Sequence, residues 1–421
     1  MPNKIIDDIS LAETRQRSRA YGTLLHEKAE AFDDETAAKN VNDYGLLDQW
    51  LAGSEPPERT HDHDSSLWTG TYVASQFYRW RTTGEEEALD NALKSLEGML
   101  TLVPVTGHDP TFARTLRPHE GGTPPPDPGS FTQGAWFQGT AGYEDMDWRC
   151  CGNNDMYQGV VYSYVLALRF LPDDAEYDTY RDRIAENIVT LLENNADAQD
   201  GQFNEVNANG IAYLATGDGQ YLTNYDTLFS PLLEAFVLAG NGLFYLWGIT
   251  DWSGQHLETV TMLTLQHLVQ ELKDEGRRGI VKRGWLAGMR NTHTVRYVLW
   301  PIAAYSFGDP GPGYEDIFAE AMWGMREAVY PKDSLDVDRR VDPAWTASPI
   351  PSLFWKFDWM DGGRHQGLYG RPLFTRGTSS CFWTTSPLDV GGGPTPWRDS
   401  GADYLHAYWM ARAYGLLTSN D

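Results

Sequence analysis

Apolar residues recur along most of this chain at the three- and four-residue spacing of an amphipathic helix. In the stretch 154–170, for example, one face holds Met156, Val160, Val161, Tyr164, Ala167 and Leu168. Strand patterns are rare, and only residues 201–206 and 211–216 predict a short hairpin. The pattern predicts an all-α fold, with helices over 8–34, 43–52, 66–82, 85–103, 154–170, 174–195, 226–248, 254–274, 291–306, 313–329 and 401–418.

Several of these helices form pairs separated by only a few residues, as antiparallel neighbours require. Two long loops, 104–152 and 331–400, carry many aromatic residues, and no stretch has the composition of an interdomain linker. We therefore expect a single domain over residues 1–421, an (α/α)6 toroid of helical hairpins with long aromatic-rich loops. An open α-solenoid is the alternative. The predicted pairs are 66–82 with 85–103, 154–170 with 174–195, 226–248 with 254–274, and 291–306 with 313–329.

The chain is strongly acidic, with 59 Asp and Glu against 33 Lys and Arg and a net charge of −26. Only eight of the basic residues are lysines. A surface of this kind suits concentrated salt, because salt screens the repulsion between like charges. We expect a halophilic protein, with an ordinary acidic enzyme as the alternative. The same charge argues against nucleic-acid binding, since phosphates bind to basic surfaces.

Neither a membrane span nor an export signal is evident. The longest apolar run, 232–249, is interrupted by Glu234 and Asn241, and the N-terminal stretch MPNKIIDDISLAETRQRSRA lacks the apolar segment of a secretory signal. Three cysteines make a poor disulfide framework, so we expect the neighbours Cys150 and Cys151 to be buried free thiols. These features predict a cytoplasmic protein that does not contact membranes.

Four polar clusters stand at or near predicted helix starts: HDHDSSLWTGTY, GNNDMY, GMRNTHTVRY and RDSGADYLHAYW. Each one alone predicts helix capping, with Asp64 or Ser65 as one cap and Asn153 or Asn154 as another. In a toroid, alternate helices run in the same direction, so these starts gather on one rim. Carboxylates, amides, arginines and indoles together are the side chains that a sugar-binding site uses.

Metal and cofactor signals are weak. The HDHD run lacks the second ligand pair of a zinc site, and calcium or another hard cation held by Asp62, Asp64 and nearby carbonyls is the alternative to zinc. The sequence has no Walker loop, no GxGxxG and no GxSxG. We expect neither a metal nor a cofactor.

The stretch DMYQG, residues 155–159, resembles a motif of the six-hairpin (α/α) glycosidases, most closely the unsaturated glucuronyl and rhamnogalacturonyl hydrolases. In that family an aspartate in this context opens an inner helix and acts as acid and base, a role that the resemblance gives to Asp155. Its partner aspartate falls on Asp64, although the residues around Asp64 match poorly. The stretches DSSLWTGTYVASQFYR, VTGHDPTFART and SGADYLHAYWMARAYG also resemble uncharacterised bacterial relatives with the same toroid.

The prediction is therefore a carbohydrate-active enzyme, a glycoside hydrolase acting on an oligosaccharide, with an unsaturated uronic acid at its end as one expected form. Asp155 and Asp64 are the predicted catalytic residues. One alternative is a polysaccharide lyase or sugar epimerase that uses His293 or His365 with a tyrosine. Another is a non-catalytic sugar-binding or scaffold protein. The predicted substrate-binding residues are Trp68, Tyr72, Trp148, Asn154, Arg290, His293, Trp359 and Arg364.

If the charge reflects adaptation to salt, raising KCl from dilute to molar concentration will raise the melting temperature of the protein. The reason is that screening removes repulsion from a chain that carries a net charge of −26. Thermal unfolding followed by circular dichroism measures this. A melting temperature that stays constant or falls would contradict the halophilic interpretation.

Overall fold

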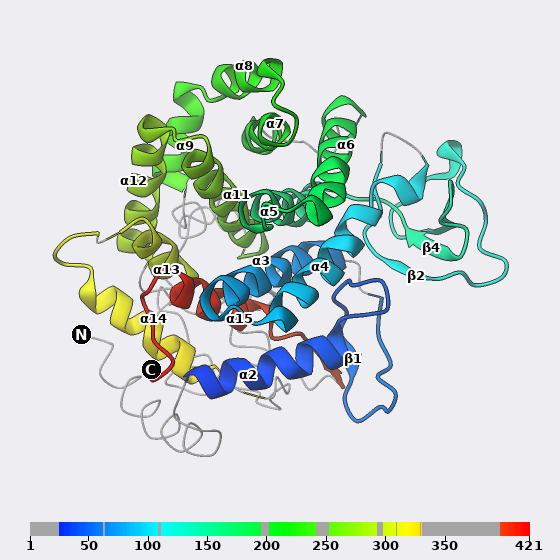
Figure 1. The fold of residues 1–421 in the computed structure, drawn as a ribbon, viewed down its shortest axis with the longest axis horizontal. Helices are drawn as coiled ribbons and strands as arrows, with labels where there is room; N and C mark the ends of the chain where they lie inside the picture. The colour runs from blue at the N-terminus through cyan, green and yellow to red at the C-terminus, as the bar shows by residue number, and fades with distance from the viewer. Residues whose placement is uncertain are drawn as a thin grey trace, which may run out of the picture.

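The computed structural model describes residues 25–61, 64–107, 111–194, 202–240, 252–292, 298–308, 310–328, 330 and 396–421. Figure 1 shows that helices dominate this part of the chain. No helix within these ranges has the length and the apolar content needed to cross a bilayer.

Most of the predicted helices are confirmed, with boundaries shifted by a few residues. Within the described residues, the prediction 291–306 matches a helix only from Leu299 on, because residues 291–292 belong to the preceding helix. The N-terminal prediction 8–34 overlaps α2, and its first part lies outside the described residues. The confirmed helices are α2 (Leu25–Glu35), α3 (Ser65–Thr83), α4 (Glu86–Thr101), α5 (Asn154–Phe170), α6 (Asp178–Asn194), α11 (Trp252–Glu271), α13 (Leu299–Ser306), α14 (Glu315–Glu327) and α15 (Ala402–Ala413). Short helical turns are η1 (Thr36–Asn40), η2 (Pro104–Thr106), η3 (Pro128–Ser130) and η4 (Ala175–Tyr177).

The helix predicted over 43–52 is wrong. This segment turns sharply and ends in β1 (Trp50–Leu51), which pairs with β5 (Trp397–Arg398). The cause is Asn42, whose side-chain oxygen accepts hydrogen bonds from the backbone N–H groups of Tyr44 (2.9 Å) and Leu46 (3.0 Å). An asparagine that bonds to nearby backbone in this way competes with helix formation.

The hairpin predicted within 201–216 is also wrong, because these residues form helix α7 (Gln202–Thr216). Val206 and Ile211 are fully buried on it. The two six-residue windows were too short to separate alternation from helical spacing. Farther on, the prediction 226–248 corresponds to two helices, α8 (Gly219–Leu228) and α9 (Pro231–Gly240), and an unpredicted helix, α12 (Glu275–Thr292), follows α11 directly.

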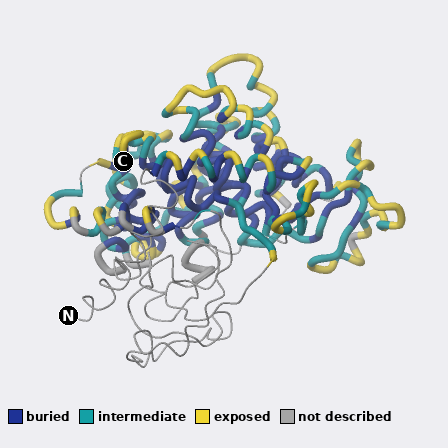
Figure 2. Tube along the Cα trace, turned by 90° about the horizontal axis from the view of Figure 1, so that it is seen from below, coloured by how far each residue is buried: buried dark blue, intermediate teal, exposed yellow. Residues whose placement is uncertain are grey.

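The helices form an α/α toroid. Helix α3 packs against α4, α5 and α15, and α5 also packs against α7 and α11. Neighbour contacts continue from α11 to α12 and α13, and α13 returns to α15, which closes the ring. Figure 1 shows α3, α5 and α15 at the centre, with α2, α4, α6, α12 and α14 around them. In Figure 2 the buried residues concentrate along this central group.

Two glycines allow α3 and α5 to touch along their backbones. A Cβ added to Gly70 would lie 2.2 Å from the carbonyl oxygen of Gly159, and one added to Gly159 would lie 2.4 Å from the carbonyl oxygen of Ser66. Farther along, the rings of Tyr78 and Phe170 are 5.7 Å apart. Because the paired positions advance in the same direction on both helices, α3 and α5 run parallel and begin at the same end of the molecule.

Hydrogen bonds connect the N-terminal end of the described chain with its C-terminal end and with α14. The backbone N–H of Leu25 donates to the carbonyl of Asp421 (2.8 Å). The buried ammonium of Lys28 donates to the carbonyls of Met325 (3.2 Å), Arg326 (2.9 Å) and Ala328 (2.7 Å) at the end of α14. A cation at this place satisfies carbonyls that a helix end leaves without intrahelical partners.

Asp33 of α2 is a buried carboxyl at the junction of α2, α3 and α15. It accepts hydrogen bonds from Gln76 Nε2 (2.6 Å) and Trp409 Nε1 (2.8 Å), and Arg79 lies 3.8 Å away. Burial raises the pKa of Asp33 to about 6, although Arg79 and the two hydrogen bonds oppose this shift. Between about pH 4 and pH 6, Asp33 is therefore protonated in the folded protein and ionised in the unfolded chain.

The long loop 104–152 contains a small antiparallel sheet that the sequence did not predict. Its order is β2–β4–β3, formed by β2 (Leu116–Pro118), β4 (Met146–Arg149) and β3 (Trp136–Gln138). Trp148 lies opposite Leu116 and Phe137, and all three are buried on one face. Trp136 lies opposite Arg149 on the other face, because side chains alternate along a strand.

Replacing Gly70 with alanine is expected to destabilise the fold by about 1–3 kcal/mol or more, since the new methyl group must push two helix backbones apart. Denaturant unfolding measures the change. Gly279→Ala is the matched control, because Gly279 lies within α12 with no atom near the position of a Cβ. The control should gain about 0.5–1 kcal/mol from helix propensity. Equal stability of the two variants would contradict the tight contact.

Asp33→Asn should gain stability relative to the wild type as the pH rises from 4 to 7, by about 3 kcal/mol. The pKa of Asp33 is higher in the folded than in the unfolded protein, so its contribution is complete below pH 4 and is lost as the pH rises through 6. Unfolding curves at several pH values give the difference. Asp34→Asn, a change at the exposed neighbour, is the control for removing one charge and should lack this trend.

Candidate functional site

Helix α5 begins with a well-formed cap. Asn153 has an extended backbone, and its side-chain oxygen accepts the backbone N–H of Met156 at 3.3 Å. Gly152 precedes it, and the ring of Phe112 lies 2.3 Å from where a Cβ would be. Asn153, and not Asn154, is therefore the cap. Asp155 lies in the first turn, half-buried, where the helix dipole favours a carboxylate.

Asp64 occupies the cap position of α3 without using its carboxylate as a cap. Its backbone carbonyl accepts the N–H groups of Leu67 and Trp68, but its side chain makes no capping hydrogen bond. Oδ1 instead accepts a hydrogen bond from Arg114 Nη2 at 2.9 Å. The carboxylate is 43% exposed and Arg114 only 6%, so a fixed, buried cation holds an accessible acid.

The structure brings Asp64 and Asp155 to the same end of the toroid. Asp64 directly precedes α3, Asp155 lies in the first turn of α5, and these parallel helices touch at Gly70 and Gly159. Asn154 and Trp68, both half-buried, belong to the first turns of the same two helices. These four of the predicted residues are therefore near neighbours in the fold.

Two predicted stacking residues do not fit that role. Tyr72 and Trp148 are completely buried, so neither presents a ring face to a ligand. Trp148 packs in the apolar face of the sheet, with the rings of Phe131 and Phe137 5.5 Å and 5.2 Å away. Tyr72 is one turn from Trp68 but is enclosed by the protein, and burial raises its pKa.

The remaining predicted residues lie elsewhere. Arg290 was expected near a helix start, but the structure places its backbone in the last turn of α12 (Glu275–Thr292). His293, Trp359, Arg364 and His365 lie outside the described residues.

Buried histidine–tyrosine pairs cross the centre of the toroid. Tyr78 Oη lies 2.7 Å from His267 Nε2, and Tyr162 Oη lies 2.7 Å from His406 Nε2. Both histidines are fully buried. Burial lowers the pKa of His406 to about 3, and burial with the nearby Arg169 lowers that of His267. These neutral pairs join α3, α5, α11 and α15 and have no exposed surface for a substrate.

Asp147 anchors the polar face of the sheet. This buried carboxylate accepts hydrogen bonds from His119 Nδ1 (2.7 Å), Thr123 Oγ1 (2.7 Å) and the backbone N–H of Glu120 (3.1 Å), and Arg117 Nε lies 3.4 Å away. Burial opposes ionisation of Asp147, but these donors outweigh it and lower its pKa. Asp147 therefore has a structural role in the sheet and its loops.

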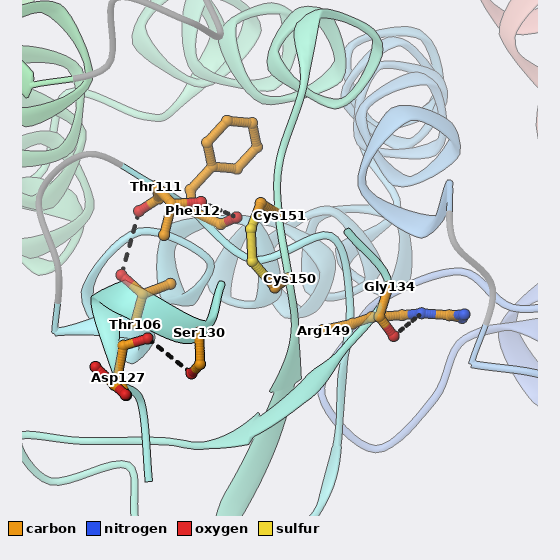
Figure 3. The surroundings of a disulfide bond; sticks show 9 residues. All are labelled: Thr106, Thr111, Phe112, Asp127, Ser130, Gly134, Arg149, Cys150 and Cys151. Carbon is orange, nitrogen blue, oxygen red and sulfur yellow. Dashed lines mark hydrogen bonds between the residues drawn. A yellow bond between two sulfur atoms is a disulfide. The ribbon is translucent and has the colours of Figure 1, made fainter. Parts of the chain in front are cut away.

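Cys150 and Cys151, expected to be free thiols, form a disulfide between neighbouring residues. Figure 3 shows this disulfide beside Phe112, between β4 and the start of α5. Backbone hydrogen bonds hold the segment, from Cys150 N–H to Ala135 and from Gly152 N–H to Phe112, both at 2.7 Å. Disulfides persist mainly in oxidising compartments, so these two cysteines do not support the predicted cytoplasmic location.

Sequence reasoning missed Arg114 and Trp136. Arg114 stands in a Gly- and Pro-rich loop and reveals its role only through its contact with Asp64. Trp136 is half-buried on the polar face of the sheet, and the sequence WFQ (136–138) has no apolar–polar alternation that would distinguish it from the buried Trp148. Among the described residues, no three His, Cys, Asp or Glu side chains form a group that could hold a metal ion.

No protein-family model matches the chain, and no curated protein matches its sequence. Among solved structures, the chain is similar to the cellulase Cel9M of C. cellulolyticum in complex with cellobiose, with a TM-score of 0.45 and 12% identity over 92% of this chain and 98% of that one. It is also similar to a GH9 protein of Bacteroides ovatus, with a TM-score of 0.42 and 10% identity over 94% and 83% of the two chains. The proposals below rest on the residues of this chain.

Proposed function

We propose that the protein is a glycoside hydrolase that acts on oligosaccharides, including those that end in an unsaturated uronic acid. The observation that supports this is that Asp64 and Asp155 lie at the adjoining starts of α3 and α5, and that the half-buried Trp68 belongs to the first turn of α3. Two carboxyl groups and an aromatic surface are the elements that acid/base cleavage of a glycosidic bond requires.

The two aspartates have different surroundings, which suits different roles. Asp64 accepts a hydrogen bond from the buried Arg114, so its side chain is held in a fixed orientation. We assign it the role of the partner that orients water or stabilises positive charge on the sugar. Asp155, in the first turn of α5, is assigned proton transfer. Asn154 beside it would hydrogen-bond a sugar hydroxyl.

A polysaccharide lyase or epimerase would use His293 or His365 with a tyrosine, and both histidines lie outside the described residues. The pairs Tyr78–His267 and Tyr162–His406 are fully buried and cannot reach a substrate. A sugar-binding protein without catalysis is the competing proposal, and a kinetic experiment separates the two.

Asp155→Asn and Asp64→Asn should each lower the turnover number on a cleaved oligosaccharide by about 100-fold or more, because each removes a group needed for proton transfer or charge stabilisation. Substrate affinity should change by less than tenfold, since both side chains keep their size and polarity. Reducing-end assays on an oligosaccharide panel give turnover, and calorimetry gives affinity.

Asp178→Asn is the matched control, because Asp178 is also a first-turn aspartate, at the start of the outer helix α6. Asp178→Asn also removes a negative charge from a helix start, but Asp178 lies away from the proposed site. This variant should therefore leave turnover unchanged. If Asp155→Asn behaves like Asp178→Asn, Asp155 is only a helix-stabilising residue. If the wild type binds sugars without cleaving any, the non-catalytic alternative replaces the proposal.

A further inference from the structure

His61 has a backbone conformation that is unfavourable for its residue type. Its φ is +49°, in the left-handed region that residues with a Cβ rarely adopt. Within the described ranges, only Ala141 and Lys273 share this property among non-glycine residues. Glycine would adopt this backbone conformation with less steric strain. The presence of a histidine here therefore indicates that its imidazole has a role. Strained backbone of this kind is concentrated at functional sites.

The Nδ1 atom of His61 is buried beside Asp48. It lies 3.5 Å from Oδ2 of this buried carboxylate, and no hydrogen bond joins the two. Asp48 is fixed in turn by Asn42 Nδ2 (2.8 Å) and by the hydroxyl of Ser65 (2.8 Å), the first residue of α3. The imidazole is 31% exposed, so it does not fill the core. With Nδ1 facing Asp48, Nε2 is the ring atom that a ligand can meet.

Trp136 lies beside His61 on the polar face of the sheet. Their ring centroids are 6.4 Å apart, with the planes nearly perpendicular. The guanidinium of Arg117 lies over the indole at 4.1 Å, and that of Arg149 lies 5.7 Å from it. These cations fix a half-buried indole in one orientation, which lowers the entropy that a ligand must remove on binding.

Both rings are tied to the start of α3, where Asp64 lies. Arg149 Nη1 donates to the backbone carbonyl of His61 at 3.3 Å. The backbone carbonyl of Arg149 accepts the N–H of Arg114 at 3.0 Å, and Arg114 holds Asp64. Hydrogen bonds through Arg149 and Arg114 therefore connect His61 and the strand opposite Trp136 with Asp64.

We infer that His61 and Trp136 form a sugar-binding subsite beside Asp64. A pyranose ring packs its C–H face against the exposed part of the indole, and His61 Nε2 hydrogen-bonds one of its hydroxyls. The ligand class is an oligosaccharide long enough to extend from Asp155 and Asp64 onto the sheet. This inference rests on the proposed function, because Asp64 links the two.

His61→Gly tests the subsite and separates it from a structural role. Glycine adopts the left-handed backbone without strain, so the melting temperature should equal or exceed that of the wild type. The dissociation constant for a bound tetrasaccharide should nevertheless rise about 3- to 10-fold, through loss of one hydrogen bond. Lys273→Gly is the matched control, since Lys273 is also left-handed (φ +55°) and lies in the turn after α11, and it should leave binding unchanged.

Trp136→Ala should raise the same dissociation constant about 10-fold or more, through loss of the stacking surface. Trp80→Ala is its control, because Trp80 is also half-buried but stands near the end of α3, away from Asp64. Calorimetric titration with cellotetraose, xylotetraose and tetragalacturonic acid gives the affinities. All three titrations use the full chain.

The outcomes separate the subsite from the proposed function. Weaker binding in His61→Gly and Trp136→Ala supports the subsite even if no tetrasaccharide is cleaved, in which case only the hydrolase proposal fails. Wild-type affinity in both variants overturns the subsite even if Asp155→Asn abolishes turnover. A wild type that binds none of the three tetrasaccharides overturns it as well.

Discussion

The contact between the backbones of α3 and α5 determines where the candidate functional residues lie. Gly70 and Gly159 have no side chains, so the two helices approach until one glycine meets the carbonyl oxygen of the other. Parallel helices in such close contact must begin side by side. Asp64 and Asp155, which are far apart in the sequence, are brought to one end of the toroid for this reason.

The same contact explains the DMYQG stretch residue by residue. Met156 and Tyr157 are fully buried and fill the core, and Gly159 provides the close approach to α3. Asp155 is the acidic residue in a first turn that is otherwise apolar or amide-bearing, and it is half-buried rather than enclosed. Most of the motif therefore serves packing, and its chemistry rests on one side chain whose position the packing sets.

The loop 104–152 contributes a small sheet whose polar face lies at the start of α3. Its small sheet has an apolar face around Trp148 and a polar face around Asp147, and the polar face adjoins the start of α3 through Arg114 and Arg149. Asp147 is consumed by hydrogen bonds within the sheet, which leaves Trp136 and His61 as groups that can meet a ligand. The short segment that contains the disulfide of Cys150 and Cys151 connects this sheet to α5.

The sequence by itself determined the helical class and most of the helices. It also showed that α3 and α5 both begin with a polar cluster that contains an aspartate. These features depend on local spacing and on capping residues such as Asn153, which act within a few positions of the chain. It failed where side chains compete with the backbone, as at Asn42, and where alternation extends over only three or four residues, as in the sheet. Only the tertiary structure decided that Tyr72 and Trp148 are buried while Trp136 is half-buried. It also decided that Arg114 holds Asp64, because burial and ion pairing depend on contacts between residues far apart in the sequence, which no local pattern encodes.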